Sequence, residues 1–282
     1  MKSPKISVIM SVYNTPRSFL EASISSVLTQ SFEDFEFIVV DDASSDGEVE
    51  EVLNRYALKD PRMEVLRNQE NLGLTRSLNR ALQIARGMYV ARQDSDDISM
   101  THRLEKQFKF MENRPEIALL GTRGYIIDEE DRIIGRWEPA LAPPLVKKKI
   151  LRGNQFLHTS VMFRRNAVLD IGGYDERFRY SQDYDLWIRL LRKYDAANLS
   201  DYLVKHRINR ESVAFKRERQ QERNLLEIWI RNLKEKNMPP EAVVYFSRIL
   251  LRHMVPMGAR TFLRRTFFRG KSYRAILLER DK

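Results

Sequence analysis

Short apolar runs rich in β-branched residues alternate with amphipathic segments along the first hundred residues. The runs at residues 6–12, 35–40, 63–66 and 88–92 are short, apolar and bounded by polar turn residues, as buried strands are. Helical spacing follows Pro16 and covers residues 48–58 and 74–85. Strands that alternate with helices in this way form a mostly parallel sheet covered by helices. The sequence therefore predicts the α/β class, with helices flanking the sheet.

The rest of the chain is less regular and ends in a basic segment. Strands are expected at 117–127, 131–137 and 159–163, and a helix at 183–194. Residues 1–215 carry 32 Lys+Arg and 32 Asp+Glu, whereas residues 216–282 carry 17 and 7, so the whole net charge of +10 lies in the last quarter. This asymmetry predicts a neutral working domain over 1–215, with halves at 1–97 and 98–215, and a basic helical tail over 216–282.

Several classes of function lack their sequence signals. The chain has no cysteine, which excludes disulfides and thiol chemistry, and it contains neither G-x-x-x-x-G-K-[ST] nor G-x-G-x-x-G. Residues 1–5 show no secretory leader, and no apolar run approaches the roughly 18–20 residues that span a bilayer. We therefore expect a cytoplasmic protein, either soluble or peripheral at a membrane.

Polar side chains follow three of the expected strands. They are Tyr13-Asn14, Asp41-Asp42 and Asp94-Ser95-Asp96-Asp97. The carboxyl ends of parallel strands meet at one edge of the sheet, where ligands collect. Carboxylates gathered there repel one another unless a cation or hydroxyl donors compensate them, and Mg²⁺ prefers oxygen ligands with phosphate in its shell. A nucleoside diphosphate bound through a divalent cation fits this edge. The alternative is that the aspartates only form turns and cap helices.

Seven motifs in order resemble glycosyltransferases of family 2, which have the GT-A fold. They are 9–14 (IMSVYN), 38–46 (IVVDDASSD), 71–74 (NLGL), 94–97 (DSDD), 158–165 (HTSVMFRR), 172–176 (GGYDE) and 182–187 (QDYDLW). The resemblance covers about residues 4–213. It implies transfer of a sugar from a nucleotide-diphosphate sugar, with inversion at the anomeric carbon, and a UDP-sugar is the expected donor. It also makes 1–97 the nucleotide-sugar-binding half and 98–215 the acceptor half.

The same resemblance implies roles for individual residues. The nucleotide-sugar would be held by Tyr13, Asn14, Asp41, Asp42, Asn71, Arg76, Asp94, Ser95 and Asp96. A Mg²⁺ or Mn²⁺ ion would be held by Asp94, Asp96 and Asp97, in a stretch similar to the family's DxD element. Asp183 matches the catalytic base, against the alternative that it only begins a helix, where Asp185 could serve equally. His158 is interpreted as an interior histidine outside the site.

Two positions depart from the family pattern. Gln182 stands where a glutamate often precedes the base, and Asn209 occupies the place of a family histidine, with His206 three residues earlier. These departures leave open a nucleotide-sugar-binding protein without turnover.

The basic tail allows two further readings of its own. Phe, Leu and Ile alternate with Arg over 257–282, which favours an anionic membrane surface beside a glycan or lipid-linked acceptor, at the inner face of the plasma membrane. A folded basic cap and a membrane or nucleic-acid adaptor are the alternatives. No helix-turn-helix, zinc or RNP pattern supports nucleic acid.

Overall fold

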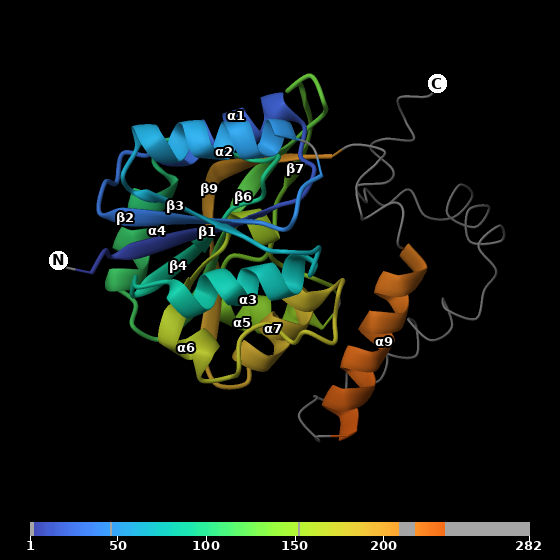
Figure 1. Ribbon diagram of the computed structural model, residues 1–282. Helices are drawn as coiled ribbons and strands as arrows, with labels where there is room; N and C mark the ends of the chain where they lie inside the picture. The colour runs from blue at the N-terminus through green and yellow to red at the C-terminus, as the bar shows by residue number, and fades with distance from the viewer. Residues whose placement is uncertain (1–2, 46, 152, 209–217, 235–282) are drawn as a thin grey trace. The chain divides into compact units, whose positions relative to one another are not determined.

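The computed structural model describes residues 3–45, 47–151, 153–208 and 218–234 (Figure 1). The chain divides into two compact units, Met1–Arg207 and Ile208–Lys282. Each is described by itself. In the second unit the structure describes helix α9 (Glu218–Lys234), which lies in the stretch predicted to be helical and basic. The predicted tail beyond residue 234, with its alternating aromatic and Arg residues, lies outside the described residues.

The first half of the first unit has the predicted βα order. Its elements are β1 (Ile6–Val12), α1 (Arg17–Leu28), β2 (Phe35–Asp41), α2 (Gly47–Lys59), β3 (Met63–Arg67), α3 (Leu74–Ile84) and β4 (Tyr89–Arg92). Where the sequence predicted both ends of an element in this half, each end lies within one residue of the predicted position. Strands of this kind are set by contiguous apolar runs, and β2 is buried along its whole length.

The second half contains elements that the apolar pattern did not predict. Its elements are β5 (Ile98–Ser99), α4 (Arg103–Glu112), β6 (Ile117–Ile127), β7 (Ile133–Trp137), α5 (Pro143–Ile150), η1 (His158–Ser160), β8 (Met162–Arg164), α6 (Arg165–Leu169), α7 (Gln182–Leu190) and β9 (Asp195–Arg207). Helices α4 and α5 and the long strand β9 were missed.

Two predicted boundaries in this half were wrong. The strand predicted at 159–163 is a 3-10 turn followed by β8, because the Ser160 hydroxyl and amide both bond the carbonyl of Leu157. The helix predicted at 183–194 ends at Leu190, where the chain turns into β9.

One mixed sheet organises the first unit. Among the described residues, nine strands form it in the order β3-β2-β1-β4-β8-β6-β9-β5, with β7 paired to β6. Strands β1 to β4 pair in parallel, as do β6 and β9. Strand β8 runs antiparallel to β4 and β6, and β5 antiparallel to β9. The predicted α/β class is confirmed, and the N-terminal half of the unit contributes four strands that pair only in parallel with one another.

Helices cover both faces of this sheet. Figure 1 shows α1 and α2 over one face and α3 over the other. A hydrophobic core lies between the sheet and the first pair of helices, where Val8 and Met10 of β1 pack with residues of α1 and α2 and with Leu104 of α4. Because side chains alternate along a strand, Ile9 faces the opposite way. Burial on both faces fixes the register of β1 and therefore the height at which its polar end begins.

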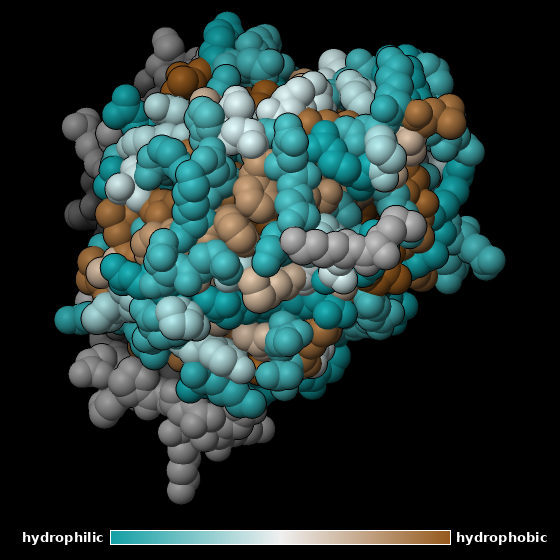
Figure 2. Space-filling view, turned by 90° about the vertical axis from the view of Figure 1, so that its left-hand side faces the viewer, coloured by the Kyte–Doolittle hydropathy of each residue, from teal (hydrophilic) through white to brown (hydrophobic). Residues whose placement is uncertain are grey.

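The surface is mainly hydrophilic on the face that Figure 2 draws, with hydrophobic side chains in separate patches between polar ones. None of the helices in the described ranges combines the length and the hydropathy that a bilayer-spanning helix requires.

Candidate active site

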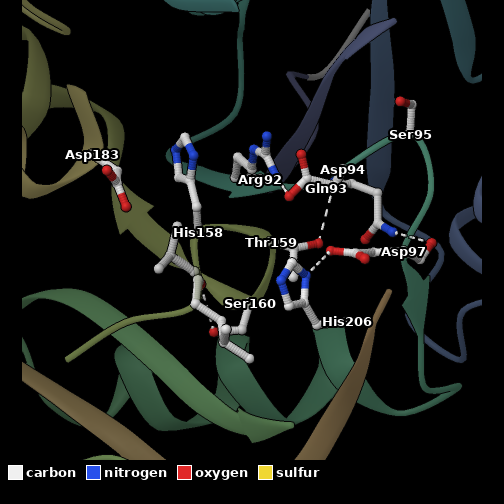
Figure 3. A network of polar contacts seen from close by, with 12 residues as sticks. Arg92, Gln93, Asp94, Ser95, Asp97, His158, Thr159, Ser160, Asp183 and His206 are labelled. Atoms are coloured by element: carbon white, nitrogen blue, oxygen red, sulfur yellow. Dashed lines mark hydrogen bonds and ion pairs between the residues drawn. The ribbon is translucent and has the colours of Figure 1, made fainter. Parts of the chain in front are cut away.

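The loop after β4 forms an acidic cluster with the end of β9 (Figure 3). Asp97 is fully buried; its Oδ1 accepts a hydrogen bond from the amide of Arg207 (2.7 Å), and its Oδ2 lies 2.9 Å from His206 Nδ1. Asp94 forms an ion pair with the buried guanidinium of Arg92. One ligand atom from each of Asp94, Asp97 and His206 lies within 4.8 Å of the others, a spacing that could hold a metal ion.

Two of the three predicted metal ligands belong to this triad. Asp96 does not belong to the triad, although its half-buried side chain lies in the same loop. His206 is the third member of the triad instead. Asn209, which stands where the family often has a histidine, lies outside the described residues. Two carboxylates and an imidazole are a donor set that Mn²⁺ or Mg²⁺ accepts, although imidazole suits Mn²⁺ better.

The charges of this cluster are unbalanced. Burial, followed by repulsion from Asp97 and Asp94, raises the pKa of Asp96 to about 7. Burial alone would lower the pKa of His206, but the charge of Asp97 and its hydrogen bond outweigh burial and raise it to about 9. Burial alone would raise the pKa of Asp94. The guanidinium of Arg92 outweighs burial and holds the pKa of Asp94 below its ordinary value. Such perturbed groups in one place are typical of functional sites.

A buried polar scaffold holds the acidic loop from behind. The Ser23 hydroxyl donates to the carbonyl of Asp94 (2.7 Å), and Gln93 Nε2 donates to the carbonyl of Asp97 (2.8 Å). Arg103 is fully buried and donates to Gln93 Oε1 (2.9 Å), among other oxygens. Burial, then the charge of Arg92, lowers the pKa of Arg103 to about 9. The loop conformation is therefore set by residues that do not face the cluster.

The acidic end of β2 differs, because protein donors already surround Asp42. Its Oδ1 accepts from Asn68 Nδ2 (2.6 Å) and the amide of Leu72 (2.9 Å), and its Oδ2 from the amide of Gly73 (2.8 Å). Asp42 thereby holds the loop that leads into α3. Asp41 is also buried, and its Oδ1 accepts from the amide of Ser44 (2.9 Å). The nucleotide-binding role of Asp41 and Asp42 stays a prediction. A ligand that bound Asp42 would have to do so beside the three N–H donors that already bond its carboxylate.

The end of β1 lies between the two acidic ends. Asn14 has a positive φ of 49° and accepts the amide of Ser45 on Oδ1 (2.8 Å), which ties the β1 end to the β2 end. Ser95 lies 2.7 Å from the hydroxyl of Thr15, oxygen to oxygen, and so ties the β1 end to the acidic loop. Tyr13 is 51% exposed and presents its ring to solvent. The predicted nucleotide-binding residues at these three strand ends thus share one edge.

Asn71 and Arg76 lie on the side of α3. Asn71 Nδ2 donates weakly to the carbonyl of Asp42 (3.4 Å), and Arg76 Nε pairs with Glu176 (3.3 Å). Asn79, one turn further along α3, bonds both the amide and the carbonyl of Tyr174. Helix α3 therefore holds the segment that leads to α7. The predicted contact of Arg76 with the nucleotide stays a prediction.

Asp183 begins α7 across the site from the acidic cluster (Figure 3). Burial raises its pKa, against hydrogen bonds from the amide of Tyr184 and from Asn154. Asp185 has a different position: it is fully buried and paired with Arg189 Nε at 2.8 Å. Arg189 in turn donates to the carbonyl of Ile171 (2.8 Å). Asp185 is thus a structural ion pair, and Asp183 is the carboxylate left at the site.

His158 was interpreted from the sequence as an interior histidine outside the site, and in the structure its ring lies close to the candidate site. Figure 3 shows its ring between Asp183 and Arg92. Its Nε2 lies 2.8 Å from the hydroxyl of Tyr174, and burial, then the charge of Arg92, lowers its pKa well below the ordinary value, so the ring is neutral. Trp187 is fully buried, and its ring packs edge-on against that of His158. No spacing in the sequence signals this position of His158, because 45 residues of varied structure separate η1 from the end of α4.

Comparison with known proteins assigns the chain to a family. A glycosyltransferase of Methanocaldococcus jannaschii is 40% identical over 215 residues, 75% of this chain and 74% of that protein. The O-antigen biosynthesis glycosyltransferase WbnJ of Escherichia coli is 34% identical over 215 residues, 73% of this chain and 81% of that protein.

A solved structure shares the fold. The S. aureus TarS 1–349 structure in complex with UDP-GlcNAc has a TM-score of 0.70 at 20% identity, and the match covers 94% of this chain and 75% of that one. The model of the family described as "Glycosyl transferase family 2" matches residues 7–178. An acidic loop after β4, a carboxylate opposite it and this similarity agree, and the chain belongs to glycosyltransferase family 2.

Proposed function

We propose that this glycosyltransferase moves a sugar, with inversion, from a UDP-sugar to a hydroxyl of a glycan or lipid-linked acceptor in cell-surface polysaccharide synthesis. The observation that carries the proposal is the single carboxylate Asp183 that faces the acidic cluster across His158 (Figure 3). The O-antigen role in the name of WbnJ supports the polysaccharide class, and the UDP-GlcNAc bound to TarS supports a UDP-sugar.

Asp94, Asp97 and His206 would hold a divalent cation beside the donor diphosphate. That cation would act as a Lewis acid for the departing diphosphate. Asp96 lies close enough to be repelled by its neighbours, and its negative charge would add to the attraction of the site for a cation.

Asp183 would act as the general base. As the acceptor oxygen forms its bond to the anomeric carbon, the hydroxyl proton passes to the Asp183 carboxylate. The bond from that carbon to the diphosphate breaks, and the nucleoside diphosphate leaves with the electron pair. The carbon passes through an oxocarbenium-like state, and attack opposite the leaving group inverts it. Burial raises the pKa of Asp183, which makes its carboxylate a better proton acceptor than an exposed one.

The decisive experiment compares Asp183→Asn with the wild type. We expect kcat to fall by about 10² or more while the donor Kd stays within a few-fold, because the base acts on the acceptor. Asp201→Asn, which removes a surface carboxylate paired with Lys106, serves as the matched control and keeps normal turnover. Donors are screened as a panel of nucleotide-sugars with Mn²⁺, and the anomer of the product is read by NMR. Near-normal turnover in Asp183→Asn, or retention of configuration, contradicts the proposal.

A nucleotide-sugar-binding protein without turnover is the second candidate, and Gln182 is the observation that favours it. Gln182 is buried at the start of α7, where the family often has a glutamate. Donor binding without release of nucleotide in the wild type, together with release in Gln182→Glu, would establish this candidate.

We also propose that residues 216–282 dock the enzyme on the anionic inner face of the plasma membrane. The support is the excess charge of that segment, most of which lies outside the described residues. Co-sedimentation with anionic and neutral vesicles at low and high salt tests it, with a chain that ends at Val255 for comparison. Equal binding to both vesicle types contradicts it.

A further inference from the structure

Asn154 lies in the loop between α5 and η1 and reaches Asp183 directly. Its Nδ2 donates to Asp183 Oδ2 at 2.6 Å. Its Oδ1 accepts the amide of Phe156 at 3.1 Å. Because a backbone amide can only donate, the side-chain oxygen must face Phe156 and the NH₂ group must face Asp183. The backbone therefore fixes Asn154 as a donor to the carboxylate.

The loop that carries Asn154 is joined to α7 at two further points. The hydroxyl of Tyr184 donates to the carbonyl of Ile150 at 2.9 Å. The ring of Phe156 packs edge-on against Trp187, with centroids 5.9 Å apart. These contacts lie on either side of Asn154 in the sequence and make the loop and the helix one packed body. A substitution of Asn154 should therefore remove its hydrogen bond to Asp183 while these two contacts keep the loop in place.

Among the residues that the structure describes, few other groups act on the Asp183 carboxylate. Arg92 of β4 contributes a favourable charge, and Tyr174 of the segment before α7 faces the same side. His158 lies between Asp183 and Arg92 and is neutral. On its own helix, Asp185 is paired with Arg189. Asn154 is therefore a main source of hydrogen bonding to this carboxylate, alongside the amides at the start of α7.

We propose that Asn154 is a positioning residue, which holds the Asp183 carboxylate by Oδ2 and keeps it oriented and charged for removal of the acceptor proton. The inference rests on the proposed function of Asp183 as the base. A hydrogen bond to the charged form of a carboxylate favours that form. The competing explanation is that Asn154 only closes the loop, in which case its removal costs stability and leaves the titration of Asp183 unchanged.

The test uses two variants and one control in the full chain. Asn154→Ala removes the donor. Asn154→Asp keeps an oxygen for the amide of Phe156 and replaces the donor with a second carboxylate, so it preserves the turn. Gln155→Ala is the matched control, because Gln155 lies in the same loop and its Nε2 donates to backbone carbonyls, that of Gly153 among them (3.0 Å), and not to Asp183. Two quantities are measured: the pKa of Asp183 by carboxyl ¹³C NMR, assigned with Asp183→Asn, and the acid limb of kcat against pH.

We expect the pKa of Asp183 and the acid limb to rise by about one unit in Asn154→Ala and further in Asn154→Asp. The donor KM should stay within about twofold, and kcat at neutral pH should fall by about tenfold in Asn154→Ala. The control should lose only thermal stability. An unmoved pKa in both Asn154 variants, or the same rise in Gln155→Ala, overturns the inference. An NMR shift without any turnover in the wild type supports the contact and instead refutes the proposed function of Asp183.

Discussion

The acidic ends of β2 and β4 look alike in the sequence but differ in their electrostatics. At the end of β2, three N–H donors of the protein surround the carboxylate of Asp42. At the end of β4, Asp94, Asp96 and Asp97 lie close enough to repel one another, and a buried arginine and a histidine only partly offset them. At the first end the carboxylate of Asp42 already has protein donors, whereas the second end carries an excess of negative charge that a cation would offset.

The difference shows how a turn-forming aspartate can be separated from one that binds a ligand. Neutral amides satisfy a carboxylate without leaving an excess of charge around it. Like charges in one buried loop leave that excess, and it appears as perturbed pKa values. The two cases are distinguished by the hydrogen-bond donors that surround each carboxylate in the structure. The sequence does not distinguish them, because in both cases aspartates follow a buried strand.

The largest expected effect belongs to Asp96. We expect Asp96→Asn to lower transfer by about 10² to 10³, because it removes negative charge from the cation site. Without metal, the same variant should gain stability. The pKa of Asp96 is raised from 3.8 to about 7 in the folded protein. Between these two pH values the native state therefore binds a proton that the unfolded state has lost, and the native state loses stability as the pH rises over this range. A rise in Tm of about 2–4 °C at neutral pH in EDTA is the measurement. Undiminished transfer would show that the cation site does not depend on the charge of Asp96.

Metal affinity should depend steeply on pH at the β4 end. A cation that binds beside His206 displaces its proton, and the pKa of that imidazole is about 9. We therefore expect Mn²⁺ to bind about tenfold more tightly per pH unit between pH 7 and 9, measured by titration calorimetry. In His206→Gln the slope over this range should flatten. A wild-type affinity that is constant with pH would show that His206 keeps its proton.

At the β2 end we expect a structural effect instead. Asp42→Asn replaces one accepting oxygen with an NH₂ group that faces N–H donors, which should cost about 2 kcal/mol in the free energy of unfolding. Urea denaturation measures it, and metal affinity should be unchanged. A variant as stable as the wild type would show that the three hydrogen bonds contribute little.

The smallest effect should come from Asp41. Asp41→Asn can still accept the amide of Ser44 but loses its ion pair with the half-exposed Arg67 (3.5 Å), so the unfolding free energy should fall by no more than about 1 kcal/mol. If the carboxylate contacts the nucleotide, the donor Kd should rise by about tenfold. Unchanged donor affinity would remove Asp41 from the binding residues and leave Tyr13 and Asn14.

The N-terminal half was predictable because its signals are local. Apolar runs such as β1 are buried on both faces, and each ends where polar residues begin. The second half was less predictable. Strand β9 mixes buried and half-buried residues, since it crosses from the sheet interior to the site, and its sequence shows no clean alternation. Its pairing with β6 spans residues 117 to 207 and depends on tertiary contacts.

The site followed the same division. Asp94 and Asp97 could be found from their place after a strand, and Asp183 from a family motif. His206 was considered only as a substitute for a family histidine, because nothing in its neighbours shows that β9 returns to the β4 loop. Asn154 and His158 stand in segments without a periodic pattern, and their approach to Asp183 is set by the fold alone.

The late return of β9 orders the assembly of the cation site during synthesis. Strands β1 to β4 can pair with one another once residue 92 has left the ribosome, but β4 still lacks its other partner, β8. Asp97 emerges next but waits 109 and 110 residues for His206 and the amide of Arg207. Long-range closures of this kind are slow. A nascent chain that ends before β9 therefore holds Asp97 without these two partners, which only the last strand of the unit supplies.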